Sequence, residues 1–271
     1  MAEGAGALKR RLVAAAVLLP AAVAWALFAP LPVYAAIGAA LLLAGAWEWA
    51  ALSGLADAAS RLGYLVVALV LMALGWWALA NPAISNGLLW AFLLFWVLAA
   101  IELRFAAPRV SRFWLGLQGL LVLVPAWFAV VVVRREAGGP ELVLALLAIV
   151  WAADAGAYFA GRAWGRHRLA PAISPGKTWE GLGGGLLGGA IAGAIASLWC
   201  PVPISVLVLL ALGVTLFSVV GDLVESRLKR VSGAKDSGRL IPGHGGLLDR
   251  IDSLCAAAPA FALGLQIWAS R

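Results

Sequence analysis

Long apolar runs follow one another along almost the whole of this chain and restrict its fold more than any other feature. They lie at roughly 12–29, 33–52, 62–80, 87–105, 113–133, 140–160, 181–199, 204–225 and 248–268. Each has, or nearly has, the roughly 20 residues that a membrane-spanning helix requires. The sequence therefore predicts an all-α, polytopic integral membrane protein with about nine transmembrane helices. Eight are expected if one run only lies along the interface.

The composition excludes a soluble domain. Only 12% of the residues are charged, whereas a soluble domain carries about 25%. The first run follows Lys9, Arg10 and Arg11, as in a secretory signal peptide, but the runs after it favour an uncleaved first helix. Cys200 and Cys255 lie in or beside apolar segments without the spacing of metal ligands. We interpret them as packing residues rather than a disulfide.

The distribution of positive charge predicts the topology. If the amino terminus is cytoplasmic, all of the 20 Lys and Arg residues except Arg134, Arg135 and Arg271 fall on the cytoplasmic side. Cytoplasmic loops of membrane proteins carry such an excess. We therefore attribute the net charge of +7 to membrane topology and expect no nucleic-acid partner.

The most polar part of the chain, 221–252, lies between the last two apolar runs and falls on the cytoplasmic side. Its acids are Asp222, Glu225, Asp236, Asp249 and Asp252. Its cations are Arg227, Lys229, Arg230, Lys235, Arg239 and Arg250. Carboxylates are ligands for Mg²⁺ or a similar hard ion, and Lys and Arg bind phosphate oxygens. The glycines beside His244 would let the backbone approach a ligand closely.

A charged loop that only fixes topology would explain these cations but not the acids. Asp222 closes one apolar run, and Asp249 and Asp252 open the next. Ionisable groups at membrane depth are costly and point to function. One helical face carries Asp222, Glu225, Ser226 and Lys229, and another carries Asp249 and Asp252. We expect a helix–loop–helix hairpin to bring both groups of carboxylates to one interface.

A second polar segment covers 154–181. Asp154 lies well inside an apolar run, with Tyr158 and Arg162 on roughly the same helical face. Two interpretations stay open, an ion pair between helices and a share in binding substrate phosphate or metal. Ser174 and Lys177 are expected in a phosphate-contacting loop.

This loop is not a P-loop. Pro171 stands where that motif requires glycine, and no strand precedes it.

Two further motifs lie outside these segments. Glycines recur every fourth residue from Gly181 to Gly193, which predicts close helix packing against a partner in the same or another chain. Glu48 stands between Trp47 and Trp49 near the cytoplasmic end of the second run. We favour an interfacial anchor over a functional role for Glu48.

Several of these segments resemble one known family. The run Ser226-Arg-Leu-Lys-Arg, four further residues, Lys235-Asp236, and then His244-Gly-Gly-Leu-Leu-Asp249-Arg-Ile-Asp252 resembles the signature of the phosphatidate cytidylyltransferases, or CDP-diacylglycerol synthases. The Asp-x-Gly-Ala-Tyr pattern at 154–158 and the segment 174–181 are similar to other parts of that family, although some relatives have lysine where Gly176 stands. The resemblance covers about 154–252.

The resemblance implies that CTP and phosphatidate react to give CDP-diacylglycerol and diphosphate. It also implies a possible homodimer and a multi-pass protein of the bacterial inner membrane, with the active site facing the cytoplasm. We expect residues 1–135 to form about five spans and residues 136–271 to form a catalytic region of about four.

Acids and cations without a nucleophilic Ser or Cys motif are typical of phosphoryl or nucleotidyl transfer. We expect Asp222 and Asp249 to hold Mg²⁺, with Asp252 and Glu225 as supporting ligands and a second cation possible. The predicted catalytic residues are Asp222, Asp249, Lys235 and His244. The predicted substrate-binding residues are Lys229, Arg230, Arg239, Ser174, Lys177, Asp154, Arg162 and Asp236. For His244, acid–base and structural roles both stay open, because a phosphate monoester with its second pKa near ~6 is already largely ionised.

Three other functions are alternatives to this one. A CDP-alcohol phosphatidyltransferase would need an Asp-Gly-x₂-Ala-Arg pattern that is absent here. A CTP-dependent lipid kinase would transfer the γ-phosphoryl group instead. A transporter would explain Asp154, but the chain has no convincing inverted repeat, and its polar residues concentrate on one side of the membrane.

Overall fold

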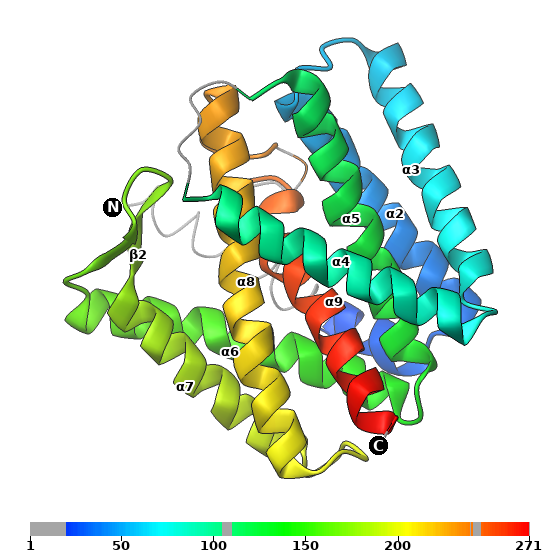
Figure 1. Cartoon of the computed structure of the whole chain (residues 1–271), viewed down its shortest axis with the longest axis vertical. Coiled ribbons are helices and arrows are strands. Elements are labelled where there is room, and N and C mark those ends of the chain that lie inside the picture. The colour runs from blue at the N-terminus through cyan, green and yellow to red at the C-terminus, as the bar shows by residue number, and fades with distance from the viewer. Residues whose placement is uncertain (1–19, 105–109, 239, 241–244, 271) are drawn as a thin grey trace.

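The computed structural model describes residues 20–104, 110–238, 240 and 245–270 (Figure 1). Its helices are α2 (Leu31–Leu52), α3 (Ala58–Ala78), α4 (Pro82–Glu102), α5 (Arg112–Arg135), α6 (Gly139–Trp164), α7 (Trp179–Ala196), α8 (Ile204–Ser232) and α9 (Leu248–Ala269). An antiparallel hairpin of β1 (Arg168–Ala170) and β2 (Ser174–Thr178) joins α6 to α7. Residues 20–28 are also helical, and the rest of the first predicted run lies outside the described residues.

Each predicted run from the second to the last corresponds to one of these helices. Among the described residues, 7 helices are long and apolar enough to cross a membrane, namely all of those above except α7. This confirms an all-α, polytopic membrane protein. Whether the number of spans is eight or nine stays a prediction.

Helix α8 continues past the end of its apolar run to Ser232, as the predicted helical face from Asp222 to Lys229 requires. Glu225 and Lys229 form an ion pair between successive turns of this extension. The helix ends where Gly233 adopts a left-handed φ of 73°, which glycine tolerates best. One local prediction was wrong. Ser174 and Lys177 were expected in a loop that no strand precedes, and instead they lie on β2, which follows the short strand β1.

Polar residues just before the helices explain where several of them begin. The side chains of Asp57, Asn81, Ser111 and Thr178 accept hydrogen bonds from backbone N–H groups in the first turns of α3, α4, α5 and α7. These N–H groups have no partner within the helix, so each cap stabilises the helix start.

Helices α5 and α9 form the centre of the molecule. Most of α5 between Val122 and Val133 is buried, and α9 packs against it as well as against α8. Helices α8 and α9 run side by side in opposite directions, and α6 lies beside α7 at the edge (Figure 1). The peripheral helices α3 and α4 expose many large apolar side chains, as expected of surfaces that face lipid.

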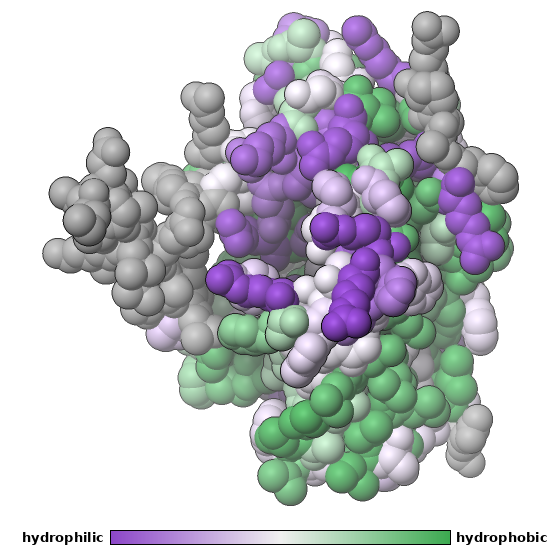
Figure 2. All heavy atoms as spheres, turned by 90° about the vertical axis from the view of Figure 1, so that its left-hand side faces the viewer, coloured by the Kyte–Doolittle hydropathy of each residue, from purple (hydrophilic) through white to green (hydrophobic). Residues whose placement is uncertain are grey.

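The helices begin and end at two opposite ends of the bundle. At one end of the bundle, Arg227 near the end of α8 pairs with Glu102 at the end of α4, at 2.8 Å. At the other end, Arg135 at the end of α5 donates a hydrogen bond of 2.7 Å to the carbonyl of Leu79, just after α3. Figure 2 shows hydrophilic residues gathered in the upper half of one face and hydrophobic residues below. This arrangement agrees with the alternation of sides that the charge distribution predicts.

The glycine face of α7 packs within this chain. A Cβ atom on Gly184 would collide with Ala160 of α6, and one on Gly193 would lie 2.8 Å from the carbonyl oxygen of Leu207 of α8. The predicted packing role is thereby confirmed, and its partners are α6 and α8. The close approach of α6 to α7 holds the hairpin between them in place.

Substituting two adjacent glycines of α7 tests this packing. Gly184→Ala should lower stability by about 1–3 kcal/mol, the usual cost of overpacking. Gly183→Ala is the matched control, because a Cβ there meets nothing within 4 Å and removing a helical glycine stabilises by about 0.5–1 kcal/mol. The measurement is the midpoint of thermal unfolding in detergent micelles. Equal shifts of the unfolding midpoint in both variants would contradict the close packing of Gly184 against α6.

Candidate active site

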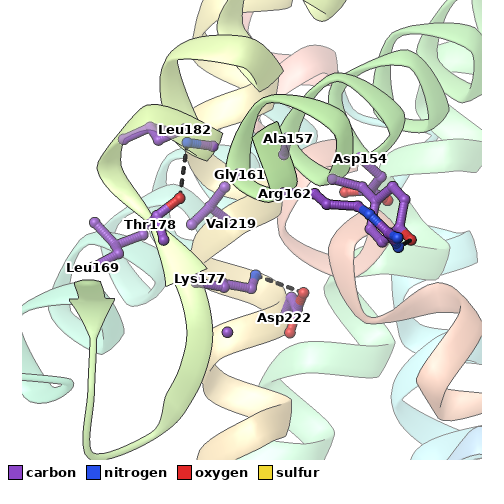
Figure 3. A pocket seen from close by; sticks show the side chains of 13 residues that line it. Asp154, Ala157, Gly161, Arg162, Leu169, Lys177, Thr178, Leu182, Val219 and Asp222 are labelled. Carbon is purple, nitrogen blue, oxygen red and sulfur yellow. Dashed lines mark hydrogen bonds and ion pairs between the residues drawn. The ribbon is translucent and has the colours of Figure 1, made fainter. Parts of the chain in front are cut away.

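A cavity of about 410 Å³ opens between α6, the β-hairpin, α7 and α8 (Figure 3), and we call it the polar cavity because charged side chains of both polar segments line it together with small and aliphatic residues. Asp154, Tyr158 and Arg162 line it from α6, Lys177 and Thr178 from β2, and Asp222 from α8. The three α6 residues share one face, as predicted, and Arg162 donates a hydrogen bond of 3.0 Å to the Tyr158 hydroxyl. The cavity therefore unites residues from both polar segments of the sequence.

An ion pair joins the two segments across this cavity. Lys177 Nζ lies 2.5 Å from Asp222 Oδ2. The other carboxylate oxygen of Asp222 accepts a hydrogen bond of 3.2 Å from the Ser226 hydroxyl. Both charged side chains stay partly accessible, at 24% for Lys177 and 31% for Asp222. A ligand in the cavity can therefore reach them without unfolding of the helices.

The hairpin that carries Lys177 is fixed to the start of α7. The carboxylate of Glu180 lies 2.6 Å from His167 Nδ1 and accepts hydrogen bonds from the backbone N–H groups of Arg166 and His167. The hydrogen bond with the His167 side chain is the main reason that the pKa of Glu180 falls to about 2. Glu180 thus keeps its charge, and its hold on the hairpin, at every pH near neutrality.

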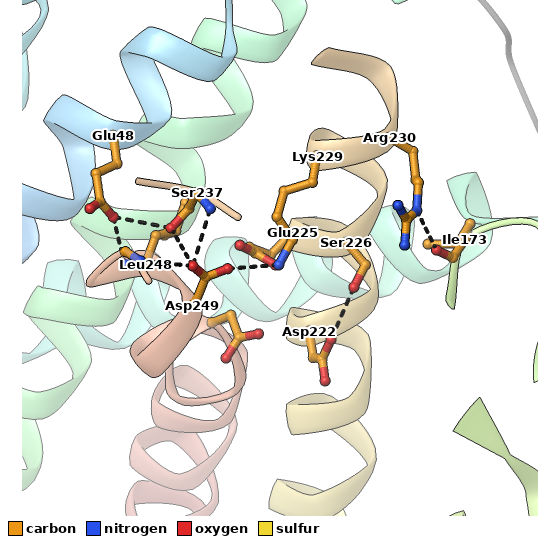
Figure 4. A network of polar contacts seen from close by, with 12 residues as sticks. Glu48, Ile173, Asp222, Glu225, Ser226, Lys229, Arg230, Ser237, Leu248 and Asp249 are labelled. Atoms are coloured by element: carbon orange, nitrogen blue, oxygen red, sulfur yellow. Dashed lines mark hydrogen bonds and ion pairs between the residues drawn. The ribbon is translucent and has the colours of Figure 1, made fainter. Parts of the chain in front are cut away.

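A second cluster surrounds Lys229 near the end of α8 (Figure 4). Its Nζ atom lies 2.5 Å from Glu225 Oε2 and 2.7 Å from Asp249 Oδ1. Asp249 Oδ2 accepts hydrogen bonds from the backbone N–H groups of Ser237 and Gly246. The predicted hairpin of α8 and α9 therefore does bring Glu225 and Asp249 together, with Lys229 between them.

Asp252 connects the two clusters. It lies one turn after Asp249 on α9 and interacts electrostatically with Asp222, Lys177 and Asp154. It also lies within electrostatic range of Glu225. Several carboxylates thus share one small region, and their mutual repulsion favours the binding of cations there.

An apolar cavity of about 200 Å³ adjoins this region. Residues of α2, α5, α6 and α9 line it, most of them aliphatic or aromatic, including Leu42, Val130, Leu146 and Leu254. Asp154 lines both cavities, so the apolar space begins where the polar space ends. Asp154 is exposed, and its carboxylate interacts electrostatically with Asp222 and Lys177. An ion pair between helices and a share in binding substrate phosphate or metal both stay predictions for Asp154.

The other predicted site residues either do not line the polar cavity or lie outside the described residues. Arg230 donates a hydrogen bond of 3.3 Å to the carbonyl of Ile173, between β1 and β2. Ser174 is half-buried on β2, and Lys235 and Asp236 are exposed in the turn after α8. Arg239 and His244 lie outside the described residues.

The interpretation of Glu48 as an interfacial anchor was wrong. Its side chain is only 5% exposed, and it accepts hydrogen bonds from the backbone N–H groups of Leu247 and Leu248 at the start of α9. Glu102, which pairs with Arg227, was not singled out from the sequence. One feature of the sequence could have pointed to both residues, because each is a lone carboxylate near the end of an apolar run.

The fit of the site to a metal ion depends on two of the predicted ligands. Among the described residues, no three His, Cys, Asp or Glu side chains are grouped closely enough to hold a metal. Mg²⁺ needs only one or two carboxylates when water and phosphate oxygens complete its shell. Asp222 and Asp252 interact electrostatically and could supply these two carboxylates. Both oxygens of Asp222 and both oxygens of Asp249 have partners in this structure, so a cation bound by either residue would replace one of those partners.

Comparison with known proteins agrees with this geometry. Residues 9–268 match the model of the cytidylyltransferase family. The chain is 43% identical to the phosphatidate cytidylyltransferase of Pseudomonas aeruginosa, over 97% of this chain and 98% of that protein. It is 37% identical to the protein of the same name from Haemophilus influenzae, over 94% and 97% of the two chains. The similarity thus extends beyond the polar segments to the amino-terminal helices. The chain belongs to the cytidylyltransferase family.

Proposed function

We propose that this chain is a nucleotidyltransferase of phospholipid biosynthesis that converts CTP and phosphatidate into CDP-diacylglycerol and diphosphate. The observation that carries the proposal is the meeting of the two polar segments in one cavity, beside an apolar cavity. An enzyme that joins a water-soluble nucleotide to a membrane lipid needs both environments at one place. The names of the relatives, which align along nearly the whole chain, support the same reaction.

The two cavities suggest where each substrate binds. The phosphate groups of both substrates would occupy the polar cavity, beside Lys177 and Arg162. An acyl chain of phosphatidate would enter the apolar cavity, which the polar one meets at Asp154. A lipid in this position keeps its tail out of water while its phosphate reaches the cytosolic substrate.

The reaction needs charge neutralisation more than a strong base. An oxygen of the phosphatidate phosphate forms a bond to the α-phosphorus of CTP, and the bond from that phosphorus to the bridging oxygen breaks, which releases diphosphate. A phosphate monoester is largely dianionic near neutral pH, with its second pKa near ~6, so it attacks without prior loss of a proton. Repulsion between two polyanions is the main obstacle. In this proposal Lys177 in the polar cavity and Lys229 beside Asp249 would reduce the repulsion, with Arg230 next to the hairpin as a further cation.

We further propose that the site takes Mg²⁺, held by Asp222 and Asp252 with Asp249 and Glu225 nearby; a second cation would use the same carboxylates. The ion would supply positive charge to the phosphates of CTP. The support is the chemistry of the donor set, which consists of carboxylate oxygens close to cations that bind phosphate.

The seven apolar helices and the bacterial relatives support a multi-pass protein of the bacterial inner membrane. The charge distribution supports a cytoplasmic amino terminus and active site. A homodimer remains part of the proposal on the strength of the resemblance alone, because the glycine face of α7 is used within the chain.

A labelled-nucleotide assay tests the reaction. Purified protein in mixed micelles with phosphatidate, Mg²⁺ and CTP labelled at the α-phosphate should transfer label to the lipid fraction. The transfer should require phosphatidate, stop when EDTA removes divalent cations, and return when Mg²⁺ is added in excess.

Two other outcomes would contradict this proposal. Transfer of label from γ-labelled CTP to a lipid alcohol would establish a lipid kinase instead. Unchanged transfer in EDTA would contradict the metal proposal but leave the cytidylyl transfer intact.

Cysteine labelling tests the orientation. Ser232→Cys lies at the exposed end of α8, and Ala137→Cys is exposed between α5 and α6, at the opposite end of the bundle. A membrane-impermeant maleimide should label Ala137→Cys in spheroplasts and Ser232→Cys only in inverted vesicles. The native Cys200 and Cys255 are buried and should give little background. The reverse pattern would overturn the proposed topology.

A further inference from the structure

Glu48 on α2 is a buried carboxylate that lies far in sequence from the polar segments (Figure 4). It contacts Ser237, shortly after α8, and the first residues of α9. Its Oε1 atom accepts a hydrogen bond of 3.1 Å from the N–H of Leu247. Its Oε2 atom accepts one of 2.9 Å from the N–H of Leu248 and lies 3.2 Å from the Ser237 hydroxyl. One side chain thus holds both the start of α9 and the turn that follows α8.

These contacts supply the cap that α9 lacks in its own sequence. The N-cap residue of α9 is Leu247, whose side chain has no polar atom to accept a hydrogen bond. The first N–H groups of a helix have no partner within the helix, and they carry its positive dipole end. The carboxylate of Glu48 satisfies two of them and places a negative charge where that dipole favours one.

Two glycines fit the connection closely around this carboxylate. A Cβ atom on Gly238 would lie 2.7 Å from Glu48 Cδ, and one on Gly246 would lie 2.6 Å from Glu48 Oε2. No other residue type could bring its backbone this close without displacing Glu48. Both glycines therefore serve the contact with α2.

The contacts continue from Glu48 to the charged cluster on α8. The Ser237 hydroxyl lies 3.0 Å from Asp249 Oδ2, and the N–H groups of Ser237 and Gly246 donate to the same oxygen. The opposite oxygen of Asp249 faces Lys229 at 2.7 Å. The position of Asp249 is therefore set by backbone groups that Glu48 holds in place.

We propose that Glu48 is a positioning residue for the transfer reaction, through which the amino-terminal helices hold Asp249 and Lys229 in their working geometry. This inference rests on the proposed function where it is tested by kcat, and it is independent of that function where it is tested by the mobility of a spin label. Glu48 does not reach the polar cavity itself, whose lining comes from α6 to α8.

The test variant is Glu48→Gln, which keeps the size of the side chain. An amide has one acceptor oxygen, and its NH₂ group would face an N–H of Leu247 or Leu248, so at least one hydrogen bond is lost. We expect kcat for cytidylyl transfer to fall at least about tenfold, the scale of a lost charged hydrogen bond, with the KM for CTP nearly unchanged. The control is Asn81→Ala, which removes a helix cap from α4 at the opposite end of the bundle. It should lower thermal stability and leave kcat unchanged.

A spin label gives a readout that does not depend on activity. Leu240→Cys provides an attachment point in the same connection, where the side chain is 55% exposed. In the Glu48→Gln background the label should become more mobile, whereas in the Asn81→Ala background its spectrum should match that of the parent. Protein without Leu240→Cys reports any labelling of the native cysteines.

The results separate a positioning role of Glu48 from a general effect on stability and from a failure of the proposed function. Unchanged kcat and unchanged label mobility in Glu48→Gln would overturn the inference. Equal losses of kcat in Glu48→Gln and Asn81→Ala would also overturn it, because a general loss of stability would then explain both. A parent protein that transfers no label to lipid would refute the proposed function instead, and the spin-label comparison would still test the role of Glu48.

Discussion

A charged side chain at the level of a membrane is costly unless an opposite charge meets it, and this constraint shapes the functional half of the molecule. Lys177 meets Asp222, Lys229 meets both Glu225 and Asp249, and Arg227 meets Glu102. Each pair joins different elements or successive turns of α8. The need to pair charges therefore draws the β-hairpin, α4, α8 and α9 to one end of the bundle, and the candidate site lies where these elements meet.

The same pairs prepare the site for anionic ligands. Lys177 and Lys229 already stand beside carboxylates, so an arriving phosphate competes with Asp222 and Asp249 for them. The carboxylates in turn become available to a cation. Free enzyme and substrate complex can thus both keep their charges paired, which is what transfer between two polyanions requires. Glu48 contributes differently, because it accepts hydrogen bonds from backbone groups and does not line the polar cavity.

The sequence allowed the fold to be predicted closely because a bilayer requires about 20 mostly apolar residues in every spanning helix. It allowed the main site residues to be placed together because 154–181 and 221–252 interrupt the apolar pattern on the same side of the membrane. The β-hairpin was missed because three- and five-residue strands leave no periodic signal in a segment rich in Pro and Gly. The roles of Glu48 and Glu102 were missed for another reason. Leu248, which donates to Glu48, and Arg227, which pairs with Glu102, each lie more than a hundred residues away along the chain, and no local pattern encodes such a contact.

A double-mutant cycle between Lys177 and Asp222 tests the central claim most directly, namely that the two polar segments form one catalytic site. Lys177→Met and Asp222→Asn should each lower kcat/KM for cytidylyl transfer. If the two side chains act as a unit, the double variant should be hardly worse than the poorer single variant, with a coupling energy within about 0.5–3 kcal/mol. Independent effects that multiply in the double variant would contradict the claim, because they would mean that the segments contribute separately.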